Sequence, residues 1–566
     1  MREDAAKESE EEGMRRWVGS LGRVVVGVAW MGLAACGGAS PGPASPADVA
    51  ASGSPNSPAS PAAAAASAPA STAKSDPFVL PEGPRDDAPI SVDPGSLRLD
   101  AWDKATKVKG VAAVPATCTA FVSRAAAKPA PKDLKSALAE RDVAKRDAML
   151  AALEGDKTID APKGLVRALR ADLAPIECAD ALVDPVLRKS NEVSGRVGHA
   201  LVGLSLAGKL ARTANTPPTL AGVEKASKDK VLAFVKGPLK TWLLEQATAI
   251  ETLSAGASGL SGYGRGVAAI EAGAADLRLV DKMRSAPVPA GWDVELKGVY
   301  EAALDEALEP RKKRGRDAAL VGLTDFAQAG VLHDGRVERT RALLGKLYGG
   351  RRIDALDALM LGGPETAPVM GGVSPFWIDV THAMPIDDPK AIAEQGLTED
   401  LRAKVRAQRE WASPELRSAY ARARLDMGRE YWRRVDFVEA AYAAKGSNSP
   451  EDRLVLAVAL ALVHGPNGPK EMMLGASPEA LDLRHTEALD ALVAEGGPLA
   501  GAAAFDAAHL WAVSTTAGDK APAQLRDAAA RFRKAELLLT DPAAKKRASE
   551  RASDLEAAAS AAEKKI

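Results

Sequence analysis

Apolar residues recur at steps of three and four along most of the chain, which is the spacing of one face of an α-helix. In LRDAAARFRKAELLL this face consists of Leu525, Ala528, Phe532, Ala535 and Leu539. The same spacing predicts helices over 337–347 and over 353–360. Helical spacing of this kind begins at about residue 116 and continues to the end of the sequence. The pattern therefore predicts an all-α protein.

One segment is apolar on every side instead of on one face. It is LVLAVALALV, residues 454–463. A helix needs about 20 apolar residues to span a bilayer. This segment is much shorter, so it predicts a buried helix.

Three segments share the chemistry of a helix start. Ser-Pro-Glu occurs at 413–415, 449–451 and 477–479. Serine caps free backbone N–H groups, proline fits the first helical position, and glutamate faces the positive end of the helix dipole. Starts that follow one another at such intervals indicate successive helical hairpins, the pattern of an α-solenoid.

Part of the chain resembles tetratricopeptide repeats. Ala528, Phe532 and Ala535 have the alanine, aromatic and alanine spacing of the family's second helix, and LLLTDP follows where the family has a proline-marked turn. A second match is partial, because Ala444 and Ser447 stand where the family has an aromatic and a small residue. Its matching residues are Met427, Gly428, Tyr431 and Ala440. The resemblance implies an α-solenoid of TPR-like helical hairpins with a concave face, and an irregular helical bundle is the alternative.

The N-terminal part contains an apolar stretch of the length found in signal peptides. This stretch is 24–35, VVVGVAWMGLAA, and the basic residues Arg15 and Arg16 precede it. It leads into LAAC, which ends at Cys36 and resembles the lipobox of bacterial lipoproteins. That resemblance implies removal of residues 1–35, a diacylglycerol on the Cys36 sulfur and usually an acylated amino group. The alternative is a short buried helix that ends in a core cysteine.

The leader and the linker beside this cysteine carry further signals. The residues before Met14 are acidic, whereas a lipoprotein leader is short and basic, so Met14 is the expected start. Residues 36–88 are rich in Ala, Ser and Pro and are predicted to be a disordered linker. About 45 such residues span roughly 40 Å as a coil. Gly37 replaces the aspartate that marks inner-membrane retention in some bacteria, which favours the outer membrane with the body facing the periplasm.

The charge balance argues against nucleic-acid binding, and the cysteines predict a disulfide. The chain has 74 basic and 75 acidic residues, so it lacks the basic excess that is typical of nucleic-acid binding. Besides Cys36, the cysteines are Cys118 and Cys178. An even number in an oxidising compartment predicts a disulfide between them. Two separately buried thiols are the alternative.

These observations divide the chain into segments. The divisions are 1–35 signal peptide, 36–88 lipidated cysteine and linker, 89–255 N-terminal helical domain, 256–361 helical hairpins, 362–390 irregular loop and 391–566 C-terminal TPR-like region.

Several short motifs have a structural interpretation. GLSLAGKL, 203–210, has the spacing of a phosphate-binding loop. It ends in Leu210, where such a loop needs a hydroxyl group for magnesium, so the segment is interpreted as part of a helix. SGYGRG, 261–266, is interpreted as a hinge between helices, and SKDK, 227–230, as a solvated helix start. PRKKRGR, 310–316, is interpreted as a solvated face balanced by the preceding LDEALE, with contact to anionic envelope polymers or lipids as the alternative.

The segment 362–389 interrupts the helical pattern for nearly thirty residues, and loops of this length are often functional. Within it PFWIDV is predicted to form a short extended segment. Its candidate binding residues are Trp377, Asp379, His382, Asp387 and Asp388. Asp379 and His382 are close enough in sequence to share a metal or a proton. The alternatives are a catalytic site, a ligand or partner contact, and a crossover held by Phe376 and Trp377. The other histidines, at 199, 333, 464, 485 and 509, are interpreted as structural.

The sequence thus predicts a lipid-anchored envelope protein whose helical body binds a protein partner. It predicts no cofactor, no resident metal and no nucleic-acid partner. An envelope hydrolase that uses 362–389 is one alternative, and a purely structural lipoprotein is another.

Overall fold

The computed structural model describes residues 76–80, 92–154, 164–222, 228–286, 288, 291–348, 353–361, 372–407, 411–468, 470, 481–515 and 522–564. The expected signal peptide, Cys36 and the helix start at 477–479 lie outside these residues. Within them helices dominate, and the strands β1 (Ser96–Arg98) and β2 (Glu192–Ser194) pair antiparallel with Leu97 opposite Val193. The prediction of an all-α protein is confirmed.

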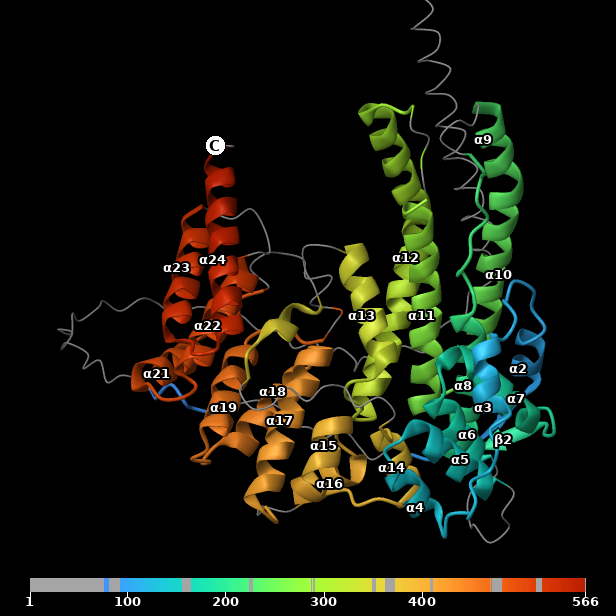
Figure 1. Cartoon of the computed structure of the whole chain (residues 1–566), viewed down its shortest axis with the longest axis horizontal. Coiled ribbons are helices and arrows are strands. Elements are labelled where there is room, and N and C mark those ends of the chain that lie inside the picture. Colours follow the sequence, from blue (N-terminus) through green and yellow to red (C-terminus); the bar gives the residue numbers. More distant parts are fainter. Residues whose placement is uncertain are drawn as a thin grey trace, which may run out of the picture.

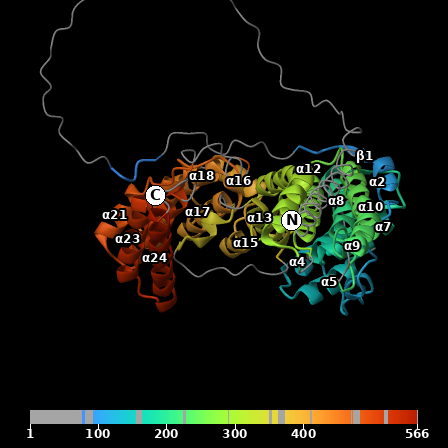
Figure 2. The same ribbon diagram turned by 90° about the horizontal axis from the view of Figure 1, so that it is seen from above.

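The helices follow one another in chain order along an elongated molecule, as Figures 1 and 2 show. The N-terminal body contains α2 (Asp100–Ala105), η1 (Ala116–Cys118), α3 (Thr119–Val122), α4 (Leu134–Ala139), α5 (Val143–Leu153), α6 (Leu165–Leu173), η2 (Ile176–Cys178), α7 (Ala179–Leu187) and α8 (Gly195–Ala211). The next elements along the chain are α9 (Lys228–Phe234), the π-helical η4 (Val235–Leu239), α10 (Lys240–Gly256), α11 (Gly262–Arg284), α12 (Val294–Gln328) and α13 (Gly335–Tyr348).

The second half of the chain is also helical, and its last two helices form a hairpin. Its elements are η5 (Ala355–Ala358), α14 (Pro375–Thr381), α15 (Pro389–Gln395), α16 (Glu399–Ala407), α17 (Pro414–Tyr431), α18 (Arg434–Ala444), α19 (Pro450–Leu462), α21 (Glu487–Glu495), α22 (Ala500–Thr515), α23 (Pro522–Leu538) and α24 (Pro542–Glu563). In Figure 1, α23 and α24 stand at the opposite end of the molecule from α2 and α7.

One continuous hydrophobic cluster runs from Leu99 to Val513 and so passes through the expected boundaries after residues 255 and 361. A smaller cluster joins α22, α23 and α24 around Phe505 and Phe532. The predicted apolar face of α23 is confirmed, since Leu525, Ala528, Phe532, Ala535 and Leu539 are all buried. The apolar segment 454–463 is likewise buried, within α19 and at its end.

The predicted serine caps form at the described helix starts. Ser413 accepts the N–H of Leu416 at the start of α17, and Ser449 accepts the N–H of Asp452 at the start of α19. Proline occupies the first turn in both helices. The sequence rule therefore fixes where these helices begin.

The segment SGYGRG is not a hinge, because it forms the first turn of α11. A Cβ atom on Gly264 would lie 2.2 Å from the His199 carbonyl oxygen, and one on Gly203 would lie 2.1 Å from the Gly264 carbonyl oxygen. Glycine here allows α8 and α11 to cross with their backbones in contact.

Two further predictions of local structure are wrong. PFWIDV is helical, as α14, because Pro375 fits the first turn of a helix and tertiary burial of its apolar residues overrides their strand preference. The predicted helix over 353–360 is reduced to the single 3-10 turn of η5. Leu356 and Ile353 are buried there all the same.

Phe78 lies in the segment expected to be a disordered linker, yet it packs against the main hydrophobic cluster. The Arg453 guanidinium carbon of α19 lies 5.7 Å from its ring centroid. The local sequence FVL is more apolar than its Ala, Ser and Pro surroundings, which explains why this point contacts the body.

The basic run 310–316 lies within α12, and its arginines are not a solvated face. Arg311 pairs with Asp276 at 3.0 Å, while Arg314 pairs with Asp276 and with Glu251, both at 2.6 Å. These acids come from α11 and α10, because α12 packs along α11 for much of its length. The preceding LDEALE supplies a partner for Lys312, which pairs with Glu309 at 3.6 Å. The run therefore joins three helices.

Candidate functional site

The sequence-predicted residues of 362–389 lie around α14, and Trp377 belongs to a buried polar network. Its Nε1 donates to Asp172 Oδ2 at 2.8 Å. Tyr263 donates its hydroxyl to the same carboxylate at 2.9 Å, and Arg336 Nη1 donates to Asp172 Oδ1 at 2.9 Å. Phe376 stacks on Tyr263 with ring centroids 4.3 Å apart. Trp377 thus joins α14 to α6, α11 and α13 and is part of the core.

Asp379 binds the start of a helix. Its Oδ2 accepts the N–H of Glu399 at 2.7 Å and its Oδ1 accepts the N–H of Asp400 at 3.3 Å. Burial raises its pKa to about 6, although these two backbone hydrogen bonds oppose the shift. His382 lies 3.5 Å from the carboxylate of Asp400 and is mostly exposed. The structure therefore brings both residues to the start of α16, where His382 pairs with Asp400.

The other two acids of this segment have local partners. Asp387 forms a partly exposed ion pair with Lys404 at 3.0 Å. Asp388 accepts the N–H of Lys390 and caps α15. The two acidic side chains thus stabilise helices around the segment.

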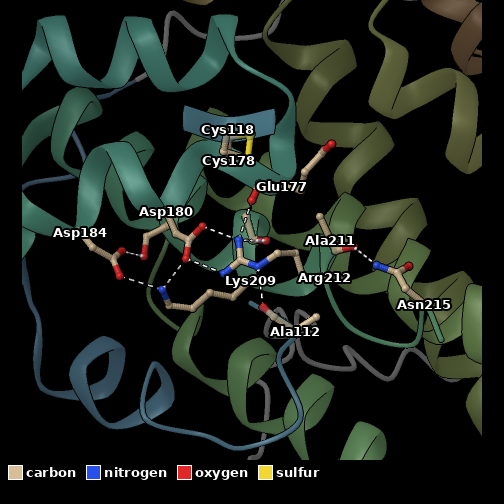
Figure 3. Close-up of polar contacts among 12 residues, drawn as sticks. Ala112, Cys118, Glu177, Cys178, Asp180, Asp184, Lys209, Ala211, Arg212 and Asn215 are labelled. Atoms are coloured by element: carbon tan, nitrogen blue, oxygen red, sulfur yellow. Dashed lines mark hydrogen bonds and ion pairs between the residues drawn. A yellow bond between two sulfur atoms is a disulfide. The ribbon is translucent and has the colours of Figure 1, made fainter. Parts of the chain in front are cut away.

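A disulfide joins Cys118 and Cys178, whose Cα atoms lie 5.3 Å apart, and both residues are buried. It connects η1 with η2 in the N-terminal body (Figure 3). Close to it, Arg212 donates to the carbonyl oxygens of Ala112 at 2.9 Å and of Glu177 at 2.6 Å. The disulfide and this arginine therefore hold the same set of loops against α8.

Figure 3 also shows the position of the lysine of GLSLAGKL. Lys209 Nζ donates to Asp180 Oδ2 at 2.8 Å and to Asp184 Oδ2 at 2.7 Å. Burial favours the neutral form of Asp180, but the hydrogen bonds and charges of Arg212 and Lys209 outweigh it and lower its pKa. All these residues lie on α7, on α8 and just after it, so Lys209 has a structural role.

A pocket lies where α13, η5 and α17 meet, and its volume is about 330 Å³. It is lined by His333, Glu338, Arg341, Ala342, Asp354, Asp357, Asp426, Arg429 and Glu430. These residues supply five carboxyl groups and two guanidinium groups, so the pocket is acidic.

Both guanidinium groups of the pocket have anionic and carbonyl partners. Arg341 Nη2 donates to Asp357 Oδ1 at 2.8 Å and to the Ile353 carbonyl oxygen at 3.2 Å. Arg429 Nη1 donates to Asp426 Oδ1 at 2.8 Å, and its Nη2 donates to the Leu356 carbonyl oxygen at 2.9 Å. The two arginines fix η5 against α13 and α17.

Glu430 is buried in the wall of this pocket, with an exposed fraction of 6%. Its Oε2 accepts the backbone N–H of His333 at 3.2 Å, whereas its Oε1 has no hydrogen-bond partner. Burial raises the pKa of Glu430 to about 7, although the charge of Arg341 opposes the shift. The residue also lies in the last turn of α17, where the helix dipole disfavours a negative charge.

His333 faces Glu430 from the connection between α12 and α13. Its backbone is left-handed, with φ 57°, and its Nδ1 lies 4.0 Å from Glu430 Oε2. Burial lowers its pKa, and Nε2 is buried without a hydrogen-bond partner. The two residues line the pocket, and each has one buried polar atom without a hydrogen-bond partner.

This pocket is not predicted from the sequence, in which His333 is interpreted as a structural histidine. The lining residues come from segments that lie far apart in the sequence, and ordinary helix surfaces also carry acids and arginines at this spacing. The order Asp426, Arg429, Glu430 in the last turns of α17 is the local signal, since it places acids at the carbonyl end of a helix.

The fold and the pocket define the structural class of this protein. It is an all-α protein of successive helices, with an acidic pocket between three of its elements. Comparison with protein-family models, with curated proteins and with solved structures found no match. Across the part of the chain that the structure describes, no helix is both long and apolar enough to cross a membrane. In the same residues, no three His, Cys, Asp or Glu side chains are grouped so as to hold a metal ion.

Proposed function

We propose that this is an exported, lipid-anchored protein whose helical body binds another macromolecule near a bacterial membrane. The observation that carries the proposal is the buried disulfide between Cys118 and Cys178. Disulfides persist in oxidising compartments such as the periplasm and are rare in the cytosol. The lipobox resemblance of LAAC at Cys36 supports the same compartment.

Binding by the body is the part of the proposal that rests on the fold. Successive helical hairpins expose long surfaces that repeat proteins use for partners. Close packing of α17 against α18 supports a helical hairpin at this point, since a Cβ on Gly428 would lie 2.4 Å from the Phe437 ring. A tether that spans roughly 40 Å lets such a surface search the space beside the membrane.

Lipidation is tested by replacing the acceptor cysteine. The natural chain is expected to incorporate a clickable palmitate analogue and to enter the detergent phase, and Cys36→Ser is expected to do neither. Cys118→Ser with Cys178→Ser is the matched control and keeps the label. A correctly processed, membrane-released product from Cys36→Ser would contradict lipidation at this residue.

Partner binding is tested by cross-linking the protein in its own envelope and identifying neighbours by mass spectrometry. A reproducible protein neighbour, lost when excess purified body is added, is the expected result. Recovery of lipid and bulk envelope polymer alone would overturn the binding function and favour a purely structural lipoprotein.

A further inference from the structure

The acidic pocket has two acceptors that lack a donor. His333 Nδ1 lies 4.0 Å from Glu430 Oε2. In the neutral tautomer that carries its proton on Nδ1, on the side of this carboxylate, Nε2 is an acceptor. Glu430 Oε1 is the second acceptor, and neither atom has a partner in the structure. Buried acceptors without donors are costly, so this wall favours a ligand that is rich in N–H groups.

The charges around the pocket favour a positive ligand. Arg341 and Arg429 are each paired with a carboxylate, Asp357 and Asp426 respectively. Glu430 and the exposed Glu338 add further negative charge to the same cavity. Since a cation entering the pocket meets excess negative charge and an unsatisfied carboxylate, its binding is electrostatically favourable.

We propose that this pocket binds the guanidinium group of an arginine side chain on the macromolecular partner. A cavity of about 330 Å³ is large enough for a side chain and far larger than a single ion needs. Guanidinium is planar, carries five N–H donors and is less strongly hydrated than an ammonium group. It can therefore satisfy Glu430 and His333 together at a lower desolvation cost than lysine.

The inference rests on the proposed function in one respect, which is that a macromolecular partner carries the arginine. The preference of the pocket for a guanidinium group does not depend on that function. Its test therefore needs neither the lipid anchor nor the partner. The probe is N-acetyl-arginine methylamide, and its uncharged match is N-acetyl-citrulline methylamide. Binding to the full chain in non-ionic detergent at pH 8 is measured by saturation-transfer NMR.

The expected Kd for the arginine probe is on the order of 1 mM, with the citrulline probe at least about tenfold weaker. Glu430→Gln is expected to weaken arginine binding at least about tenfold, because it removes a charge-assisted hydrogen bond. Glu338→Gln, at the exposed rim, is expected to weaken binding about twofold. The matched control is Glu556→Gln, whose carboxylate pairs with Arg533 on the surface of α23 and α24 and is expected to leave binding unchanged.

Glu430→Gln is expected to fold at least as stably as the natural chain at pH 8, so a loss of binding in this variant cannot be attributed to unfolding. Equal binding of the arginine and citrulline probes would overturn the inference. Unchanged binding by Glu430→Gln would overturn it as well. Neither result would affect the cross-linking test of the proposed function, which detects a partner wherever it binds.

Discussion

At the scale of single residues, buried charges fall into two groups. Some are paired, such as Arg424 and Asp436, which are both fully buried and lie 2.6 Å apart. Others are carboxyl groups that accept a backbone N–H, as Glu430 does from His333 and Asp506 does from Met360. Burial raises the pKa of both carboxyl groups, because an unpaired charge is disfavoured in a low-dielectric interior.

The raised pKa of Glu430 makes folding stability depend on pH. Its pKa in the folded state is about 7, against an ordinary value of 4.5. The folded state therefore holds a proton that the unfolded state releases, so this contribution is fully present below about pH 4.5 and is lost as the pH rises through 7. The groups that face it are His333, Arg341 and Tyr431, with Asp334 nearby.

Glutamine does not ionise, so Glu430→Gln is expected to remove the decrease in stability that occurs as the pH rises through 7. At pH 8 its free energy of unfolding should exceed that of the natural chain by about 2–3 kcal/mol. At pH 4.5 the two proteins should be nearly equally stable. Urea unfolding at both pH values, followed by circular dichroism, measures the difference. A glutamine variant that is less stable than the natural chain at pH 8 would show that Glu430 is charged and paired in the fold.

At the scale of elements, small residues decide how closely helices pack. Gly264 of α11 faces the His199 carbonyl of α8, and Gly428 of α17 faces the Phe437 ring of α18. At each position a Cβ atom would overlap the neighbouring helix. The sequence shows these glycines only as weak helix formers, because each packs against a residue of another helix, and His199 lies far from Gly264 along the chain.

Gly264→Ala is expected to lower the free energy of unfolding by about 2–3 kcal/mol, because the added methyl forces α8 and α11 apart. Gly298→Ala in α12 is the matched control. Nothing lies within 4 Å of a Cβ at Gly298, so this change should raise stability by about 0.5–1 kcal/mol through helix propensity. Urea unfolding measures both. Equal effects of the two substitutions would show that α8 and α11 do not cross in backbone contact.

Helix starts and apolar faces could be predicted because their signals are local. Ser413 and Ser449 cap the helices that Ser-Pro-Glu predicts, and the face around Phe532 is buried as its spacing requires. The helical conformation of PFWIDV could not be predicted, since Trp377 is held by Asp172, far away in sequence. The pocket could not be predicted for the same reason. Glu430 and His333 meet only after α12, α13 and α17 have packed.

At the scale of the whole molecule, most helices share one hydrophobic core, and α22 belongs to two. Its residues Ala503, Ala507 and Leu510 lie in the main cluster, whereas Phe505 and Ala508 lie in the smaller cluster with α23 and α24. The disulfide lies at the far end of the main cluster, where both of its cysteines are members. Loss of the disulfide should therefore lower the stability of the helices in the main cluster. It should leave the stability of the helices beyond α22 unchanged.

Replacing Cys118 and Cys178 together by alanine tests this division. The disulfide closes a loop of 60 residues, so its loss should lower the free energy of unfolding of the main cluster by about 3–4 kcal/mol. Hydrogen exchange followed by mass spectrometry should show the same decrease in protection for the slowest amides of α8, α11 and α19. Protection of α24 should not change, because its buried alanines belong to the smaller cluster. Loss of protection confined to the helices between the two cysteines would mean that the N-terminal body unfolds independently, despite the continuous core.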